Sequence, residues 1–154
     1  MTTWQLRRAT LDDLAPIMAI ESRVFDDDAW SRESMRAELT NRHGYYLVAF
    51  PPGHPEQVDA YAGLLAPPSE PQADIQTIVV AETARRHGLG RVLMPRMIAE
   101  ARDRGAEQVF LEVRADNPGA KALYDTLGFE QIAVRPRYYK GGVERSSCAS
   151  SCLQ

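Results

Sequence analysis

Residues 85–90 are Arg-Arg-His-Gly-Leu-Gly, and this stretch decides how the rest of the chain is interpreted. The apolar, β-branched run 75–80 comes before it and predicts a strand. From Gly88 onward the apolar residues recur at helical spacing. Backbone N–H groups at such a strand-to-helix junction can form a cradle for phosphate, and glycines permit its close approach. Two glycines before a helix are weak support by themselves, and an ordinary turn with its basic residues in solvent is the alternative.

The remaining segments predict strands and helices in mixed order, without repeats or a linker. Thr10 and Ser31 are expected to cap two N-terminal helices. The proline-rich segment 51–55 cannot continue a ladder, so the strands on either side of it are expected to pair as an antiparallel hairpin. Pro95 lies within a helical pattern and predicts a local kink or a late helix start. The expected strands are 5–9, 45–50, 58–66, 75–80, 109–113 and 129–134, and the helices from Gly88 and Pro118 end near Gly105 and Gly128.

Length and composition limit the possible classes of function. A chain of 154 residues with 44% hydrophobic and 25% charged residues is ordinary for one globular domain, which we expect to span residues 1–154. A formal charge of −3 does not indicate the basic surface that binds nucleic acid or an anionic membrane. The N-terminus shows no targeting segment. We therefore expect a cytoplasmic protein that is a monomer or a weak dimer. Cys148 and Cys152 are too few for a disulfide framework and lack histidine neighbours for a metal site.

A second stretch, residues 111–130, makes the first one specific. It is Leu-Glu-Val-Arg-Ala-Asp-Asn-Pro-Gly-Ala-Lys-Ala-Leu-Tyr-Asp-Thr-Leu-Gly-Phe-Glu. Residues 85–90, as Arg-x-x-Gly-x-Gly, resemble the pyrophosphate-binding motif of the GCN5-related N-acetyltransferases. Asn117 together with residues 122–129, Ala-Leu-Tyr-x-x-Leu-Gly-Phe, resembles the C-terminal motif of the same superfamily.

Within that superfamily the chain is most similar to the RimI group of bacterial ribosomal-protein alanine N-acetyltransferases. Leu-Glu-Val-Arg-Ala-x-Asn at 111–117 and the Tyr-Tyr pair at 138–139 resemble segments of that group. Ala-Trp-Ser at 29–31 is similar to the Pro-Trp-Ser of its substrate loop. The resemblance therefore extends over nearly the whole chain.

The resemblance implies a fold and an activity. The fold would be α/β (α+β), with a mixed central sheet of about six to seven strands, about four flanking helices and a splay at the acetyl-CoA site. The activity would be transfer of acetyl from acetyl-CoA, without a metal, directly to the N-terminal amine of a protein, a ribosomal protein with N-terminal alanine. An α-amino group, with a pKa of about 8, is easier to deprotonate than a lysine at about 10.4, which favours such an acceptor.

The resemblance also assigns contacts with acetyl-CoA. Backbone groups of residues 78–80 would bond the pantetheine and polarise the acetyl carbonyl, while their side chains form core. Asn117 is alternatively just the N-cap of the helix that follows it. The assigned residues are Ile78, Val79, Val80, Arg85, Arg86, His87, Gly88, Leu89, Gly90, Arg91, Asn117 and Tyr124.

Glu112 and Tyr124 are the candidates for acid–base chemistry. Glu112 lies between Leu111 and Val113, in an apolar run where an acidic side chain is unusual. A raised pKa there would suit a general base for the amine. A glutamate on an edge strand facing solvent is the alternative. The resemblance assigns Tyr124 as the general acid that protonates the departing CoA thiolate. The alternative for Tyr124 is a helix aromatic buried against the sheet.

The acceptor side has weaker candidates. Trp30, Tyr138 and Tyr139 either line an acceptor cleft or simply pack against the fold. The acidic run 26–28 could attract a basic N-terminal peptide, and a solvated loop is the alternative.

Residues 144–154, Glu-Arg-Ser-Ser-Cys-Ala-Ser-Ser-Cys-Leu-Gln, form an atypical tail. The family usually has an apolar final strand at this place. This stretch lacks the alternation of a half-buried strand and predicts a polar coil. A reading-frame shift near Glu144 is one hypothesis for the departure, and the coding DNA would decide it.

Two other functions stay open at this point. A small-molecule amine or lysine acetyltransferase would share the coenzyme half of the fold and differ in its acceptor loops. A non-catalytic acetyl-CoA-binding regulatory module is the alternative from another class. The presence of both Glu112 and Tyr124 argues against that module.

Overall fold

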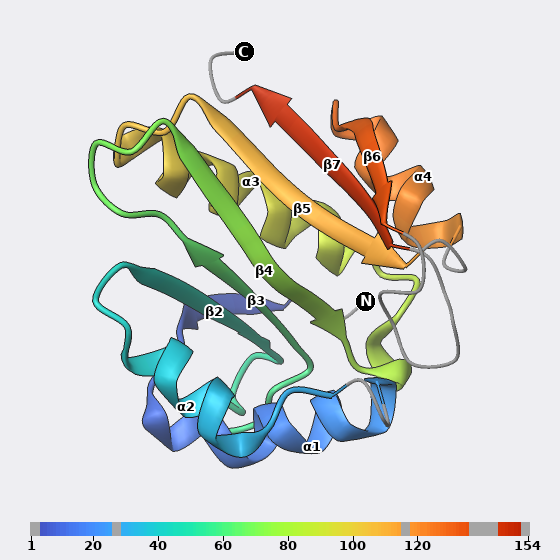
Figure 1. The fold of residues 1–154 in the computed structure, drawn as a ribbon. Helices are drawn as coiled ribbons and strands as arrows, with labels where there is room; N and C mark the ends of the chain where they lie inside the picture. Colours follow the sequence, from blue (N-terminus) through green and yellow to red (C-terminus); the bar gives the residue numbers. More distant parts are fainter. Residues whose placement is uncertain (1–3, 26–28, 115–117, 136–144, 152–154) are drawn as a thin grey trace.

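The computed structural model describes residues 4–25, 29–114, 118–135 and 145–151. Its strands form one mixed sheet of 7 strands in the order β1-β2-β3-β4-β5-β7-β6 (Figure 1). β4 and β5 run parallel, and the other neighbouring strands are antiparallel. The predicted α/β architecture, a mixed sheet flanked by helices, is confirmed.

The bounds of the elements follow the predicted ones closely. The strands are β1 (Gln5–Arg8), β2 (Gly44–Phe50), β3 (Ala60–Leu65), β4 (Gln72–Val80), β5 (Gln108–Arg114), β6 (Glu130–Arg135) and β7 (Arg145–Ser151). The helices are α1 (Leu14–Phe25), α2 (Arg32–Thr40), α3 (Leu89–Asp103) and α4 (Pro118–Thr126), with short 3₁₀ turns η1 (Leu11–Asp13) and η3 (Glu82–Ala84). Within the described ranges, none of the helices has the length and apolar character that a membrane crossing requires.

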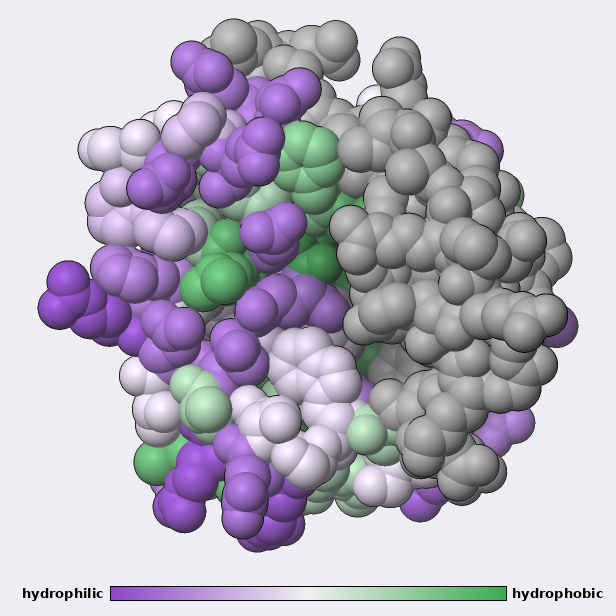
Figure 2. Space-filling model, viewed as in Figure 1, coloured by the Kyte–Doolittle hydropathy of each residue, from purple (hydrophilic) through white to green (hydrophobic). Residues whose placement is uncertain are grey.

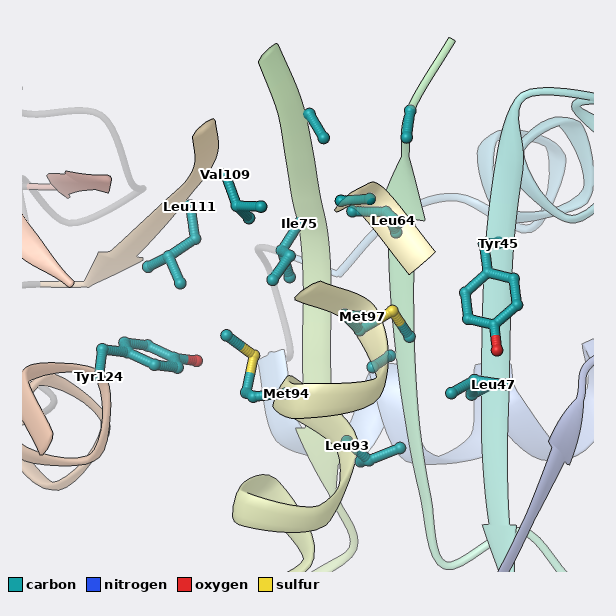
Figure 3. Close-up of a cluster of buried hydrophobic side chains, with 14 of the residues drawn as sticks. Tyr45, Leu47, Leu64, Ile75, Leu93, Met94, Met97, Val109, Leu111 and Tyr124 are labelled. Atoms are coloured by element: carbon teal, nitrogen blue, oxygen red, sulfur yellow. The ribbon is translucent and has the colours of Figure 1, made fainter. Parts of the chain in front are cut away.

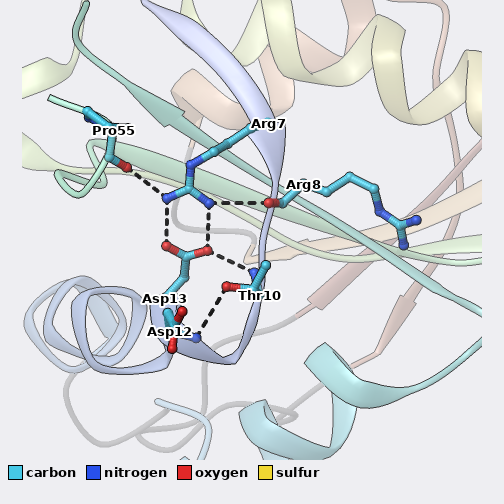
Figure 4. A network of polar contacts seen from close by, with 6 residues as sticks. All are labelled: Arg7, Arg8, Thr10, Asp12, Asp13 and Pro55. Atoms are coloured by element: carbon cyan, nitrogen blue, oxygen red, sulfur yellow. Dashed lines mark hydrogen bonds and ion pairs between the residues drawn. The ribbon is translucent and has the colours of Figure 1, made fainter. Parts of the chain in front are cut away.

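A polar network around Arg7 fixes the start of the first helical segment (Figure 4). Thr10 and Asp13 form a capping box, and the Thr10 hydroxyl also accepts from the Asp12 N–H. Arg7 donates to both carboxylate oxygens of Asp13 at 2.8 Å each and to the Pro55 carbonyl at 2.8 Å. Burial raises the pKa of Asp13, but hydrogen bonds from Arg7 and the Thr10 N–H outweigh it and leave that pKa below its usual value. The predicted Thr10 cap is confirmed.

Hydrophobic clusters fill both sides of the sheet. Alternate residues of β3 point to opposite faces, so Tyr61 joins one cluster while Ala62 joins the other. On the first face, α1 and α2 bring Ile17 and Met35 against Tyr61 and Val79. On the second face, α3 and α4 cover the sheet (Figure 3). The residues labelled in Figure 3 on that second face include Leu47, Leu64, Ile75, Leu93, Met94, Met97, Val109, Leu111 and Tyr124.

Helix α3 begins at Leu89, directly after Gly88, and continues through Pro95. The alternative of a late helix start is therefore wrong. Proline within a helix costs about 3 kcal/mol relative to alanine. Burial of Leu93 and Met94 against the sheet offsets that cost and keeps the helix continuous.

Strand β7 corrects the coil predicted for the tail. Arg145–Ser151 lie between β5 and β6 and pair antiparallel with both. Ladders on two sides satisfy the backbone groups of a strand whatever its side chains are. A polar sequence without alternation can therefore still form a central strand.

Candidate functional site

Strands β4 and β5 separate partway along their length. Their ladder runs from the pair Gln72–Gln108 to the pair Ile75–Leu111. β4 continues to Val80 and β5 to Arg114 without further pairing to each other. The backbone groups in the second half of β4 therefore have no ladder partner in β5. The predicted splay requires this arrangement. In Figure 2 the coloured part of this face is mostly hydrophilic, and hydrophobic residues are visible near its centre, where Figure 1 places β4.

An irregularity in β4 coincides with the separation. Ile75 pairs with Leu64 and Thr77 pairs with Gly63, so Gln76 is an extra residue opposite β3. Such a bulge bends the strand that carries it. The Tyr46 hydroxyl donates to Gln76 Oε1 at 2.9 Å, and the Tyr46 ring covers Gly63, where an added Cβ would lie 2.1 Å from it. Tyr46 and its neighbours thus hold the bulge in place.

The stretch between β4 and α3 has the backbone of an anion-binding turn. Arg86 and Gly88 both have positive φ, 69° and 77°. The N–H groups in the first turn of a helix lack intrahelical partners and lie at the positive end of its dipole. A Cβ added at Gly88 would meet nothing within 4 Å, so the space above this residue is open. The backbone of the turn is therefore compatible with the predicted cradle for a pyrophosphate, which stays a prediction.

Two side-chain contacts hold this turn against the rest of the fold. Arg85 donates from Nε to the Val80 carbonyl at 3.2 Å. The Trp4 ring lies 5.1 Å from the His87 ring, and its Nε1 donates to Asp59 Oδ2 at 2.8 Å. His87 is exposed. Sequence reasoning missed Trp4, because its contact with His87 joins residues far apart in the chain.

Gly90, the second residue of α3, differs from Gly88 in that it contacts a neighbouring helix. A Cβ at Gly90 would lie 2.7 Å from Leu123 Cδ2 of α4. Gly90 therefore lets α3 approach α4 at the point where α4 carries Tyr124. Leu89 is buried beside this contact, whereas Arg91 is exposed.

The side chains of 78–80 lie where the sequence places them. Val79 is buried in the cluster under α1 and α2, and Ile78 and Val80 pack on the opposite cluster. The side chains are core, and any binding by this segment would come from its backbone.

The two candidates for acid–base chemistry lie on neighbouring elements. Tyr124 is 6% exposed, makes an edge-on contact with Phe129 at 6.0 Å between ring centroids, and points from α4 toward Met94 (Figure 3). Glu112 follows Leu111, the last residue of β5 that pairs with β4. β5 lies between β4 and β7 in the sheet and is therefore not an edge strand, although at Glu112 it pairs with β7 alone. Both candidates stand near the point of separation.

Four predictions fall on parts of the chain outside the described residues: Asn117, the acidic run 26–28, Tyr138 and Tyr139. Trp30 is described and half-buried, two residues before the start of α2. Its surroundings contain a residue that the sequence reasoning missed. Glu21 is 1% exposed, and its Oε2 accepts from the Trp30 N–H at 2.9 Å.

Glu21 also accepts a hydrogen bond on Oε1 from the Tyr61 hydroxyl. Burial raises the pKa of Tyr61, and the Glu21 carboxylate raises it further. A signal for Glu21 was present in the sequence. It lies four residues after Ile17 and seven after Leu14, which places an acid on the apolar stripe of α1.

Comparisons with known proteins point to one family. The sequence model of the acetyltransferase (GNAT) family matches residues 11–129. The chain is 34% identical over 126 residues to the N-alpha-acetyltransferase RimI of Mycobacterium tuberculosis, which covers 79% of this chain and 75% of that protein. It is 43% identical over 68 residues to the [ribosomal protein bS18]-alanine N-acetyltransferase of Escherichia coli K12. That alignment covers 44% of this chain and 46% of the E. coli protein.

A further relative is a longer protein. An uncharacterized protein of Mycobacterium leprae is 37% identical over 125 residues, or 78% of this chain and 33% of that protein. The chain thus spans about a third of that relative and less than half of the E. coli enzyme in these alignments.

Solved structures share the fold over almost the full length. The E. coli ribosomal-protein-S18-alanine N-acetyltransferase superposes with a TM-score of 0.86 at 26% identity, covering 99% of this chain and 96% of that one. Arabidopsis thaliana NAA60 in complex with acetyl-CoA superposes with a TM-score of 0.85 at 18% identity, covering 97% and 98%. At that identity the second likeness concerns the fold alone.

Proposed function

We propose that this chain, which belongs to the acetyltransferase (GNAT) family, transfers acetyl from acetyl-CoA to the N-terminal amine of a protein. The family predicted from residues 85–90 and 111–130 is confirmed, because the family model matches well over half of the chain. The activity, its acceptor and the roles of individual residues form the proposal.

The separation of β4 from β5 is the observation that carries the proposal. It leaves the backbone of β4 between Gln76 and Val80 beside the turn whose φ angles suit an anion. A pyrophosphate at the turn and an extended pantetheine along β4 fit this arrangement, since one needs N–H groups and the other needs a strand edge. Acetyl-CoA supplies the acetyl thioester. The chain supplies a polar edge for it and open space above Gly88.

The chemistry assigned to the residues follows from the needs of an amine attacking a thioester. The amine must lose a proton, and Glu112 is proposed to accept it, directly or through a water. Backbone N–H groups of β4 are proposed to stabilise the negative charge that develops on the acetyl oxygen. The thiolate that leaves requires a proton, and Tyr124 is proposed to donate it. Tyr124 is buried on the face of the sheet that α3 and α4 cover.

The proposed acceptor is the N-terminal alanine of a ribosomal protein. One sequence relative is named an N-alpha-acetyltransferase, and another is named a [ribosomal protein bS18]-alanine N-acetyltransferase. The crystal structure of the E. coli ribosomal-protein-S18-alanine N-acetyltransferase superposes on this chain over 96% of its own length. We extend that acceptor class to this chain. Trp30, with Tyr138 and Tyr139, is proposed to line the acceptor cleft.

A panel of acceptors tests the proposal. Release of CoA would be followed with a peptide that begins with the N-terminal alanine of ribosomal protein bS18, the same peptide blocked at its N-terminus, an internal-lysine peptide and small amines. We expect turnover with the free α-amine and a loss of at least about tenfold on blocking it. Turnover confined to lysine or to small amines would contradict the proposed acceptor but support the acetyltransferase activity. Binding of acetyl-CoA without any turnover would instead support a regulatory module.

A further inference from the structure

Glu21 is a carboxylate buried between α1 and the sheet. One oxygen accepts from the backbone N–H of Trp30 at 2.9 Å, and the other accepts from the Tyr61 hydroxyl. Glu21 thereby joins three segments that are distant in sequence: the middle of α1, the approach to α2, and the centre of β3.

A buried carboxylate is stable only where donors replace its water. Both donors here are neutral, a main-chain amide and a phenol. Burial, followed by the Glu21 charge, raises the pKa of Tyr61, so its hydroxyl stays protonated and remains a donor. A hydrogen bond to an ionised acceptor is about twice as strong as one between neutral groups. Glu21 therefore holds the Trp30 amide more firmly than a neutral acceptor would.

The chain on the C-terminal side of Trp30 is fixed independently. The Ser31 hydroxyl accepts from the Ser34 N–H at 3.0 Å and caps α2. The Met35 N–H bonds the Ser31 carbonyl at 3.0 Å, and the Met35 side chain is fully buried. The helix can therefore form without Glu21. What Glu21 adds is the position of the backbone at Trp30.

We propose that Glu21 is a positioning residue for the acceptor peptide, which fixes the Trp30 backbone and with it one wall of the acceptor cleft. The inference rests on the proposed function, in which Trp30 lines that cleft. Glu21 is 1% exposed and both of its oxygens are engaged, so it does not act as a second base. Its second partner, Tyr61, pairs with Val79 of β4. Glu21 thus lies beside the strand proposed to hold the acetyl group.

Two substitutions at Glu21 separate anchoring from charge. Glu21→Met keeps the approximate size and shape and removes both acceptors, so the Trp30 N–H loses its partner. Glu21→Gln retains an acceptor for Trp30 and can donate to the Tyr61 oxygen. We expect Glu21→Met to raise the KM for an alanine-initiated peptide about tenfold. The KM for acetyl-CoA should change less than about twofold, and Glu21→Gln should restore most of the peptide affinity.

A matched control removes the other hydrogen bond. Tyr61→Phe leaves the bond between Glu21 and Trp30 in place, so the peptide KM should stay within about threefold of the wild type. A residue with a merely structural role would affect both substrates alike in all three variants.

Hydrogen exchange at the Trp30 amide tests the anchor without reference to activity. In the wild type this amide should exchange more slowly than the amides of Gly53 and Glu56, two exposed residues of the loop between β2 and β3, and Glu21→Met should abolish the difference. A wild-type Trp30 amide that exchanges as fast as that loop overturns the inference even if Glu21→Met does not fold.

The kinetic outcomes distinguish this inference from the proposed function. A wild-type protein that acetylates no peptide overturns the proposed function and the acceptor role of Glu21 together. A wild type that acetylates the peptide, while Glu21→Met keeps its peptide KM or loses acetyl-CoA affinity equally, overturns the inference alone.

Discussion

The proposed coenzyme side and the proposed acceptor side of the site are built in different ways. On the coenzyme side the working parts are backbone: positive φ at Arg86 and Gly88, and the edge of β4. On the acceptor side a buried side chain, Glu21, holds Trp30 and Tyr61 together. A backbone cradle depends on a few residues that permit unusual φ angles, whereas a buried polar network depends on every partner. Substitutions on the two sides should therefore change different kinetic constants.

The largest effect is expected at Glu112, between the two sides. Glu112→Gln removes the proposed base and should lower kcat by about 10²–10⁴-fold. Both KM values should change little, because neither the coenzyme cradle nor the acceptor wall is altered. Steady-state kinetics with each substrate varied would measure this. Glu107→Gln is the matched control, because Glu107 is an exposed acid just before β5. An equal loss of kcat in Glu107→Gln would contradict the assignment of Glu112 as the base.

Asp13 tests whether the start of α1, the helix that carries Glu21, depends on a buried side chain for its stability. Asp13→Asn should lower the free energy of unfolding at pH 7 by about 1–2 kcal/mol, because Arg7 loses its ionised partner. The pKa of Asp13 is lower in the folded protein than in the unfolded chain. Its stabilisation is therefore complete above the unfolded pKa of about 4 and is lost as the pH falls through the folded value.

Urea denaturation at pH 7 and at pH 3 would measure the effect of Asp13→Asn. The difference between wild type and variant should shrink at the lower pH. Asp12→Asn, an exposed neighbour, should show a smaller difference. A difference that does not depend on pH would contradict the role given to the ion pair.

Gly88 tests the backbone cradle against a matched glycine. Gly88 and Gly53 have similar φ angles, 77° and 82°, and an added Cβ meets nothing within 4 Å at either. Alanine at either position should cost about 1 kcal/mol of stability. We expect Gly88→Ala alone to raise the KM for acetyl-CoA, about fivefold, because the N–H groups of the turn would be displaced. Equal KM values for acetyl-CoA in the two variants would contradict the proposal that the turn at Gly88 binds the coenzyme.

Trp4 should give the smallest effect. Trp4→Phe keeps an aromatic ring beside His87 but loses the hydrogen bond to Asp59. We expect the KM for acetyl-CoA to rise about twofold, with no change in the KM for the peptide. Calorimetric titration with CoA would show the same loss. A change in the peptide KM instead would place Trp4 on the acceptor side.

The same contrast explains what the sequence could predict. The turn at residues 85–90 is local. Its glycines and the helical spacing of the apolar residues that follow indicate it within a few residues. The hairpin around 51–55 and the cap at Thr10 are also local, and both are confirmed. The bond between Glu21 and Trp30 and the contact between Trp4 and His87 join residues that are brought together by the fold alone.

Gly90 and the tail show two further limits of sequence reasoning. Gly90 was assigned to the coenzyme by resemblance, and the structure adds a packing reason in Leu123. The strand β7 was missed because its side chains lack alternation, while the ladders to β5 and β6 form through the backbone. A residue pattern describes side chains, and a central strand does not need a favourable one when both edges are paired.

Tandem mass spectrometry of one acceptor tests the central claim most directly. The acceptor is a peptide with a free N-terminal alanine and an internal lysine, incubated with the protein and acetyl-CoA. We predict that the acetyl group is found on the alanine α-amine, that lysine stays unmodified, and that Glu112→Gln suppresses the product. Acetyl on the lysine, or no enzyme-dependent acetylation of either amine, would contradict the assignment of this chain as a protein N-terminal acetyltransferase.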